Sequence, residues 1–97
     1  MKSVMISFDQ ASYEKVVAAL DRTNCRGFTL FPLTNGRGSN TGEPHFGSHA
    51  WPATCSTIIS VMEDEKVDRL LQRLHEIDKE SEMLGLRAFV WDIEKSI

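Results

Sequence analysis

The chain has 97 residues, of which 41% are hydrophobic and 26% charged, and its formal net charge is −3. This length suits one domain with one hydrophobic core, so we expect residues 1–97 to form a single domain. The sequence carries no basic tail or stripe, which argues against nucleic acid as a partner because phosphate binding needs clustered Lys and Arg.

The two cysteines, Cys25 and Cys55, are too few for a disulfide framework. No apolar run reaches the length of a transmembrane helix, and the first ten residues lack the core of a signal peptide. We therefore expect a cytoplasmic protein with free thiols.

The first third of the chain predicts a strand, a helix and a second strand. Val4, Ile6 and Phe8 alternate with more polar residues, as in a half-buried strand. A helical stripe follows at Tyr13, Val16, Val17 and Leu20. Either Asp9 or Ser12 can cap this helix, and Asn24 and Gly27 suit its end. Residues 28–33 predict a second strand, with Pro32 at a sheet edge or at the strand end because proline donates no ladder hydrogen bond.

The stretch from Thr34 to Trp51 has no periodicity and contains four glycines and Pro44. These residues exclude a helix or a central strand. An irregular segment of this length in a small domain indicates a functional loop.

The remainder predicts a strand, a helix and a last strand. Residues 53–62 alternate between two faces, with Thr57, Ile59 and Val61 on one and Ile58, Ser60 and Met62 on the other. Acidic residues 63–65 favour a helix start. The buried stripe of this helix is Val67, Leu70, Leu71, Leu74 and Ile77. Gly85 ends the pattern, and residues 86–94 predict the last strand.

This order predicts an α+β fold, the ferredoxin-like βαββαβ sandwich, with both helices on one face of an antiparallel sheet and the long loop between strands two and three. Alternation cannot place every apolar strand residue beneath the helices. The surplus is Met5, Ile58, Met62, Phe89 and Trp91. We therefore expect the open sheet face to pack against other copies of the chain.

The chain resembles the PII signalling superfamily, particularly its divergent PII-like branch. SYEKVVAALDRTNCRGFTLFPLTNGRGSN is similar to the family's first helix, second strand and T-loop base, and EDEKVDRLLQRLHEI to its second helix. The resemblance implies a non-enzymatic regulatory homotrimer. It also implies a small effector, commonly an adenine nucleotide, in clefts between subunits, and a long loop over residues 34–51 that docks on a target protein such as a membrane transporter or an enzyme.

The same resemblance implies effector-binding residues. Gly27, Phe28 and Thr29 match the segment that lines the cleft, and Gly36, Gly38 and Asn40 match the T-loop base. Arg37 could add positive charge there. The family's glycine-rich B-loop with a lysine is replaced by the acidic stretch DKESEMLGLRAF. We therefore expect an effector that is smaller or less charged than ATP, or none.

Four loop residues raise further hypotheses. His45 and His49, with Cys55 six residues beyond, could bind a divalent metal, although no fourth ligand is evident. A CutA-like trimeric metal-binding protein with the same fold is the alternative function. Phe46, together with these histidines, could contact a target protein. We interpret Trp51 as a loop anchor and Trp91 as subunit packing. No acid–base pair or nucleophile arrangement indicates catalysis, and Cys25 has no evident catalytic base.

Overall fold

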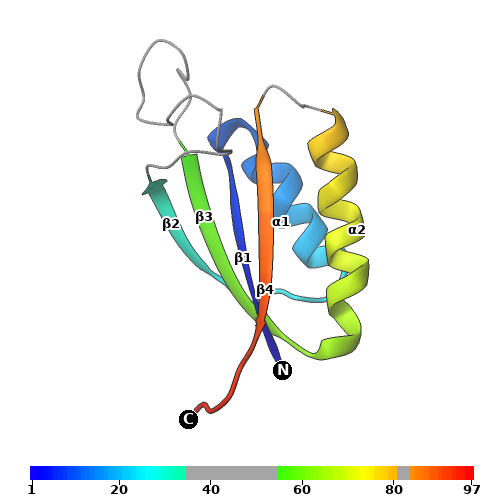
Figure 1. The fold of residues 1–97 in the computed structure, drawn as a ribbon. Helices are drawn as coiled ribbons and strands as arrows, with labels where there is room; N and C mark the ends of the chain where they lie inside the picture. The colour runs from blue at the N-terminus through cyan, green and yellow to red at the C-terminus, as the bar shows by residue number, and fades with distance from the viewer. Residues whose placement is uncertain (35–54, 81–83) are drawn as a thin grey trace.

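The computed structural model describes residues 1–34, 55–80 and 84–97, and in this part of the chain two helices cover one face of a four-stranded antiparallel sheet (Figure 1). The elements are β1 (Lys2–Asp9), the short 3-10 helix η1 (Gln10–Ser12), α1 (Tyr13–Arg22), β2 (Thr29–Thr34), β3 (Cys55–Met62), α2 (Asp64–Glu80) and β4 (Leu86–Asp92). The strands lie in the order β2-β3-β1-β4. This arrangement confirms the predicted ferredoxin-like fold.

The hydrophobic core lies between the sheet and the helices, where the predicted periodicities meet. β1 contributes Val4, Ile6 and Phe8, all essentially inaccessible to solvent. The helices contribute most residues of their predicted stripes, namely Val16, Leu20, Val67, Leu70, Leu74 and Ile77. The other stripe residues, Tyr13, Val17 and Leu71, are only partly buried against this core. Each such side chain contributes roughly 1.5–3 kcal/mol through removal from water, so the core accounts for the position of both helices.

The surplus of apolar strand residues divides between the two faces of the sheet. Ile58 and Met62 are buried in the core beneath the helices. Phe89 and Trp91 remain 54% and 46% exposed, on the face that no described helix covers. Met5 is opposite Phe89 in the register and so shares this open face.

Several boundaries differ from the sequence prediction. β2 begins and ends one residue later than expected, at Thr29 and Thr34, and β4 ends at Asp92 rather than at residue 94. Neither candidate side chain caps α1: Ser12 occupies its N-cap position without a side-chain hydrogen bond. Asp9 acts one turn earlier, where its carboxylate accepts a hydrogen bond from the backbone N–H of Ala11 at 2.8 Å. This bond caps η1, a turn that periodicity does not predict because it is too short.

Candidate effector site and loop base

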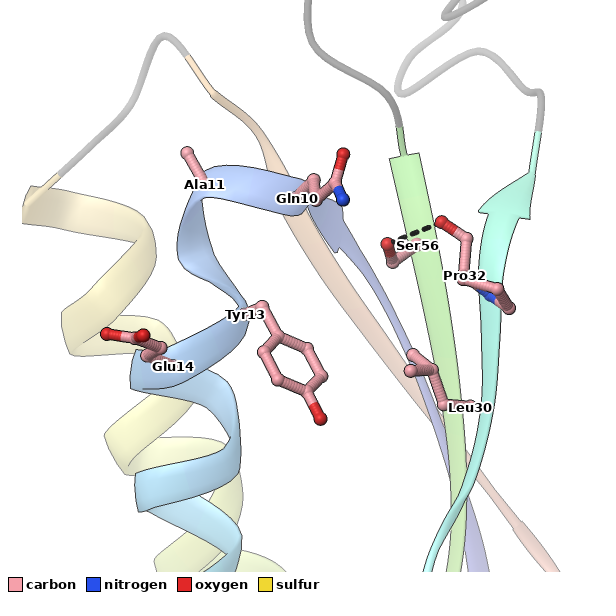
Figure 2. Close-up of a pocket in the computed structure, with 7 residues that line it drawn as sticks. All are labelled: Gln10, Ala11, Tyr13, Glu14, Leu30, Pro32 and Ser56. Carbon is pink, nitrogen blue, oxygen red and sulfur yellow. Dashed lines mark hydrogen bonds between the residues drawn. The ribbon is translucent and has the colours of Figure 1, made fainter.

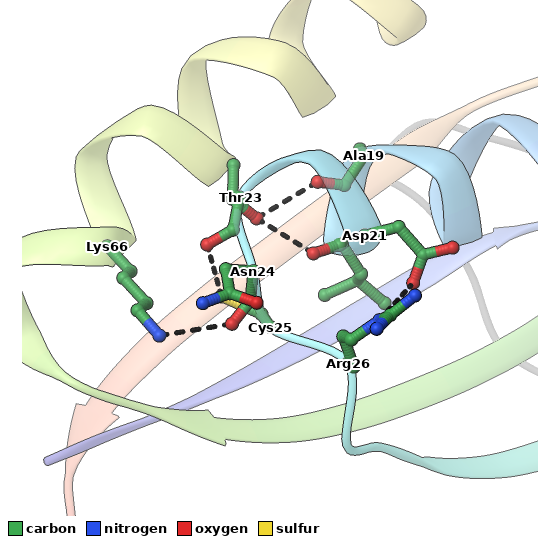
Figure 3. Close-up of polar contacts among 8 residues, drawn as sticks. Ala19, Asp21, Thr23, Asn24, Cys25, Arg26 and Lys66 are labelled. Carbon is green, nitrogen blue, oxygen red and sulfur yellow. Dashed lines mark hydrogen bonds and ion pairs between the residues drawn. The ribbon is translucent and has the colours of Figure 1, made fainter.

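The turn between α1 and β2, which leads into the predicted effector segment, is held by hydrogen bonds to both helices (Figure 3). The hydroxyl of Thr23 donates to the carbonyl of Ala19 at 2.9 Å, which closes the last turn of α1. Asn24 then adopts a left-handed backbone conformation with φ 60°, which Asn tolerates better than most residues. The Nζ of Lys66, in α2, donates to the Asn24 carbonyl at 3.0 Å. The turn is therefore tied to both helices.

The sulfur atom of Cys25 anchors this turn in the hydrophobic core. Cys25 is buried, and its Sγ lies 3.6 Å from the Sδ of Met62 and 3.5 Å from the carbonyl oxygen of Thr23. Its backbone N–H donates to the Leu20 carbonyl at 2.8 Å. Both cysteines are buried and in the reduced form. Cys25 packs in the core, so its role here is structural.

The segment Gly27–Thr29 presents different atoms to the two faces of the sheet. The carbonyl of Gly27 accepts a hydrogen bond from the hydroxyl of Ser60 at 2.7 Å, and a Cβ at Gly27 would meet no atom within 4 Å. Phe28 packs against the core, whereas Thr29 is exposed. Any ligand beside this segment would therefore meet mainly the Gly27 backbone and the Thr29 side chain, since the Phe28 side chain is partly buried against the core.

The other predicted site residues lie outside the described residues. These are Gly36, Arg37, Gly38 and Asn40 of the predicted T-loop base, the candidate metal or target residues His45, Phe46 and His49, and the candidate anchor Trp51. Within residues 1–34, 55–80 and 84–97, no group of three or more His, Cys, Asp or Glu side chains could hold a metal ion. The metal alternative therefore gains no support from the described part of the chain.

The described ends of the loop are joined by side-chain hydrogen bonds as well as by the sheet. The hydroxyl of Ser56 donates to the Pro32 carbonyl at 2.9 Å. The hydroxyl of Thr34 lies 3.1 Å from that of Thr57 and donates to the Cys55 carbonyl at 3.4 Å. These contacts fix where the chain leaves β2 and where it enters β3.

A shallow cavity of about 360 Å³ opens beside this loop base, between the start of α1 and β2 (Figure 2). Its lining residues are Gln10, Ala11, Tyr13, Glu14, Leu30, Pro32 and Ser56. The ring of Tyr13 points toward Leu30, whereas the carboxylate of Glu14 points away from the strands (Figure 2). The cavity therefore has an apolar wall on each side. It lies on the helix side of the sheet, away from Thr29.

On the open face, the register aligns a row of side chains across all four strands. Thr29 lies opposite Ile59, Ile59 opposite Met5, and Met5 opposite Phe89. A second row brings Val61 and Trp91 to either side of Ser3, which is only 2% exposed. The result is a continuous apolar surface of the kind that mediates protein association.

Arg87 is a candidate site residue that the sequence reasoning missed. Among the described strand positions on the open face, it is the one with a basic side chain. Its guanidinium lies 3.8 Å from the carboxylate of Asp78 in α2, and that carboxylate also accepts the backbone N–H of Leu86 at 3.2 Å. A single arginine among the apolar residues of the last strand was the available sequence signal.

Among the described residues, three pKa values depart from their ordinary positions. Burial raises the pKa of the Cys55 thiol, and the carboxylate of Asp9 opposite it acts in the same direction. The thiol is therefore a poor nucleophile at neutral pH. A hydrogen bond from the terminal ammonium of Met1 lowers the pKa of Asp64, and one with Asp92 raises the pKa of Lys2. These last two pairs lie at the end of the sheet opposite the loop base.

Comparison with known proteins places these features in a family. The family described as nitrogen regulatory protein P-II matches residues 1–97. No curated protein matches the chain. No helix among the described residues has the length and apolar character needed to cross a membrane.

Solved structures share the fold. CPII, a nitrogen regulatory PII-like protein from Thiomonas intermedia K12 bound to ADP, AMP and bicarbonate, has 24% identity and a TM-score of 0.76 over 95% of this chain and 84% of that chain. CPII bound to ADP and bicarbonate gives 26% identity and a TM-score of 0.73 with the same coverage. A protein from Thermus thermophilus described as PII-like has 23% identity and a TM-score of 0.66, over 95% of this chain and 85% of that chain.

Proposed function

Because this chain belongs to the nitrogen regulatory protein P-II family, we propose that it is a homotrimeric, cytoplasmic regulator that binds an adenine nucleotide between subunits and signals to a target protein through its long loop. The family is regulatory rather than enzymatic. The match of the family over the whole of residues 1–97 is the observation on which the proposal rests.

Subunit association is supported by the open sheet face. Phe89, Trp91 and Val61 are each about half exposed there, which is costly for a monomer in water. Because the predicted effector segment ends at Thr29 in the same row of residues, a subunit packed on this face would lie beside it. The nucleotide cleft would then form between this segment and the neighbouring subunit.

The charge of the site supports a nucleotide with few phosphates. Arg87 occupies an open-face position of β4, at the opposite edge of the sheet from the effector segment, and its guanidinium lies beside the Asp78 carboxylate of α2. It would therefore enter the cleft from the neighbouring subunit. Residues 78–82 add further acidic groups where the family has its glycine-rich loop. A triphosphate would bring about four negative charges to this end of the sheet, so AMP or ADP suits it better. The CPII complexes with ADP and AMP agree with this choice.

The loop over residues 34–51 is the proposed signalling element. Nucleotide binding would shift it between states only if the nucleotide interacts differently with each of them. Loop residues His45, Phe46 and His49 are the proposed contacts with the target protein. A cytoplasmic location agrees with the free thiols Cys25 and Cys55.

Titration calorimetry with AMP, ADP and ATP tests the proposal. We expect AMP and ADP to bind and ATP to bind no more tightly than ADP. Arg87→Gln should weaken ADP binding by roughly 10- to 100-fold, the range for a hydrogen bond to a charged group. Arg73→Gln is the matched control, because Arg73 also pairs with an acidic neighbour, Glu76 at 3.4 Å, but lies in α2, on the other face of the sheet from the proposed cleft.

Two results would contradict this function. One is the absence of a binding signal for all three nucleotides with the wild-type protein. The other is an equal loss of ADP affinity in Arg87→Gln and Arg73→Gln, because the effect would then come from net charge rather than from a site.

A further inference from the structure

The ladder between β2 and β3 changes register by one residue just before the long loop. Thr29, Leu30 and Phe31 lie opposite Ile59, Ile58 and Thr57 in regular antiparallel order, but the next pair is Thr34 with Cys55. Three residues of β2 therefore advance while β3 advances by two. The extra residue is a β-bulge over Pro32 and Leu33.

Side-chain hydroxyls stabilise the bulge where the backbone cannot. Pro32 has no N–H to donate to the ladder. Its carbonyl is satisfied by the hydroxyl of Ser56, at 2.9 Å, and Ser56 is only 3% exposed (Figure 2). Beyond the bulge, the hydroxyl of Thr34 contacts both Thr57 and the Cys55 carbonyl.

A regular ladder would pair the residues at the end of β2 differently. Without the bulge, Leu33 rather than Thr34 would lie opposite Cys55. Because side chains alternate between the two faces, this slip of one residue would exchange Thr34 for Leu33 on the open face. The pairs from Thr29 to Phe31 would be unchanged, so the rest of the sheet would not have to move.

We propose that the end of β2 is a two-register element and that Ser56 is the positioning residue that holds it in the bulged register. The register determines the direction in which the chain enters the loop and which residue, Thr34 or Leu33, faces a neighbouring subunit. This consequence rests on the proposed function, whereas the register itself is a property of the free chain. The cavity beside α1 is lined by Pro32 and Ser56, so a molecule bound there would contact the hydrogen bond that sets the register.

NMR of the isotope-labelled protein without nucleotide tests this inference. In Ser56→Ala, we expect backbone nuclear Overhauser effects between Thr34 and Cys55 to weaken and those between Leu33 and Cys55 to appear. Exchange of the Thr34 amide hydrogen should accelerate about tenfold, because one lost hydrogen bond favours local opening by that order. Ser56→Thr keeps a hydroxyl and should restore the wild-type pattern.

Ser60→Ala is the matched control. Ser60 lies on the same face of β3, is 1% exposed, and donates to a carbonyl of the neighbouring segment, Gly27, at 2.7 Å. Removing the Ser60 hydroxyl should leave the pairing of Thr34 with Cys55 intact.

The proposal is overturned if Ser56→Ala keeps the Thr34–Cys55 contacts with unchanged exchange, or if Ser60→Ala alters them equally. If Ser56→Ala does not fold, Ser56→Val decides the question. Val and Thr have nearly the same shape and differ in the hydroxyl, so a Ser56→Val variant that keeps the Thr34–Cys55 contacts as Ser56→Thr does would also overturn the proposal. Because no nucleotide is present, these results are independent of nucleotide binding.

Discussion

Removing both large aromatic side chains from the open face should dissociate the protein into subunits. An aromatic side chain carries roughly 150–250 Å² of surface, and Phe89 and Trp91 are 54% and 46% exposed. Each therefore offers about 100 Å² for burial by a neighbouring subunit, which corresponds to about 2.5 kcal/mol at roughly 25 cal/mol per Å². The double variant Phe89→Ala with Trp91→Ala should lose about 5 kcal/mol per subunit, or roughly three to four orders of magnitude in association constant.

Sedimentation velocity at micromolar concentration measures this effect. The wild type should sediment as a trimer and the double variant as a monomer with unchanged helical circular dichroism, because neither side chain belongs to the core. Gln72→Ala, on the exposed side of α2, should remain trimeric. A wild type that sediments as a monomer, or a double variant that stays trimeric, would refute the assignment of this face to subunit packing.

Four further predictions concern stability and binding. Leu70→Ala should lower the free energy of unfolding by about 2–5 kcal/mol in denaturant titrations, because Leu70 is fully buried between α2 and the sheet. Asn24→Ala should lower the free energy of unfolding by about 1 kcal/mol in the same titrations, because alanine is strained at a φ of 60°. Asn24→Gly should be tolerated, because glycine adopts this conformation without strain. The terminal ammonium lowers the pKa of Asp64 from its ordinary value of 3.8. The ionised carboxylate therefore stabilises the folded state fully above pH 3.8, and this contribution is lost as the pH falls through the lowered pKa. The stability difference between wild type and Asp64→Asn should therefore be present at about pH 6 and shrink below pH 3.8; a constant difference across that range would contradict it. Gly36→Ala combined with Gly38→Ala should abolish nucleotide binding in calorimetry while the trimer persists, and unchanged affinity would exclude a role for the predicted loop base.

The helices and their buried faces could be predicted from the sequence because their signals are local. An apolar stripe such as that of Val67, Leu70 and Leu74 can be recognised from its period of about 3.6 residues alone. The core forms where two such stripes pack on the sheet. The same holds for Asn24, whose side chain suits the left-handed end of a helix. Gly27 and Thr29 were identified through family resemblance, and the structure adds that both are exposed.

The features that were missed depend on contacts between distant residues. Arg87 became a candidate only when the register placed it on the open face, and its partner Asp78 lies on another element. The bulge at Pro32 likewise requires a hydroxyl from Ser56, 24 residues away in the sequence. Neither pairing has a local pattern that a single sequence can reveal.

The sequence by itself determined the order of the elements and most of the core, because both follow from residue types at short and regular spacing. It indicated the family through a resemblance of whole segments, which the family match over residues 1–97 confirms. Only the tertiary structure decided which apolar strand residues remain exposed, since alternation defines two faces without saying which one the helices cover. It also decided the register at the loop base, because one residue's difference in pairing depends on hydrogen bonds across the sheet rather than along the chain.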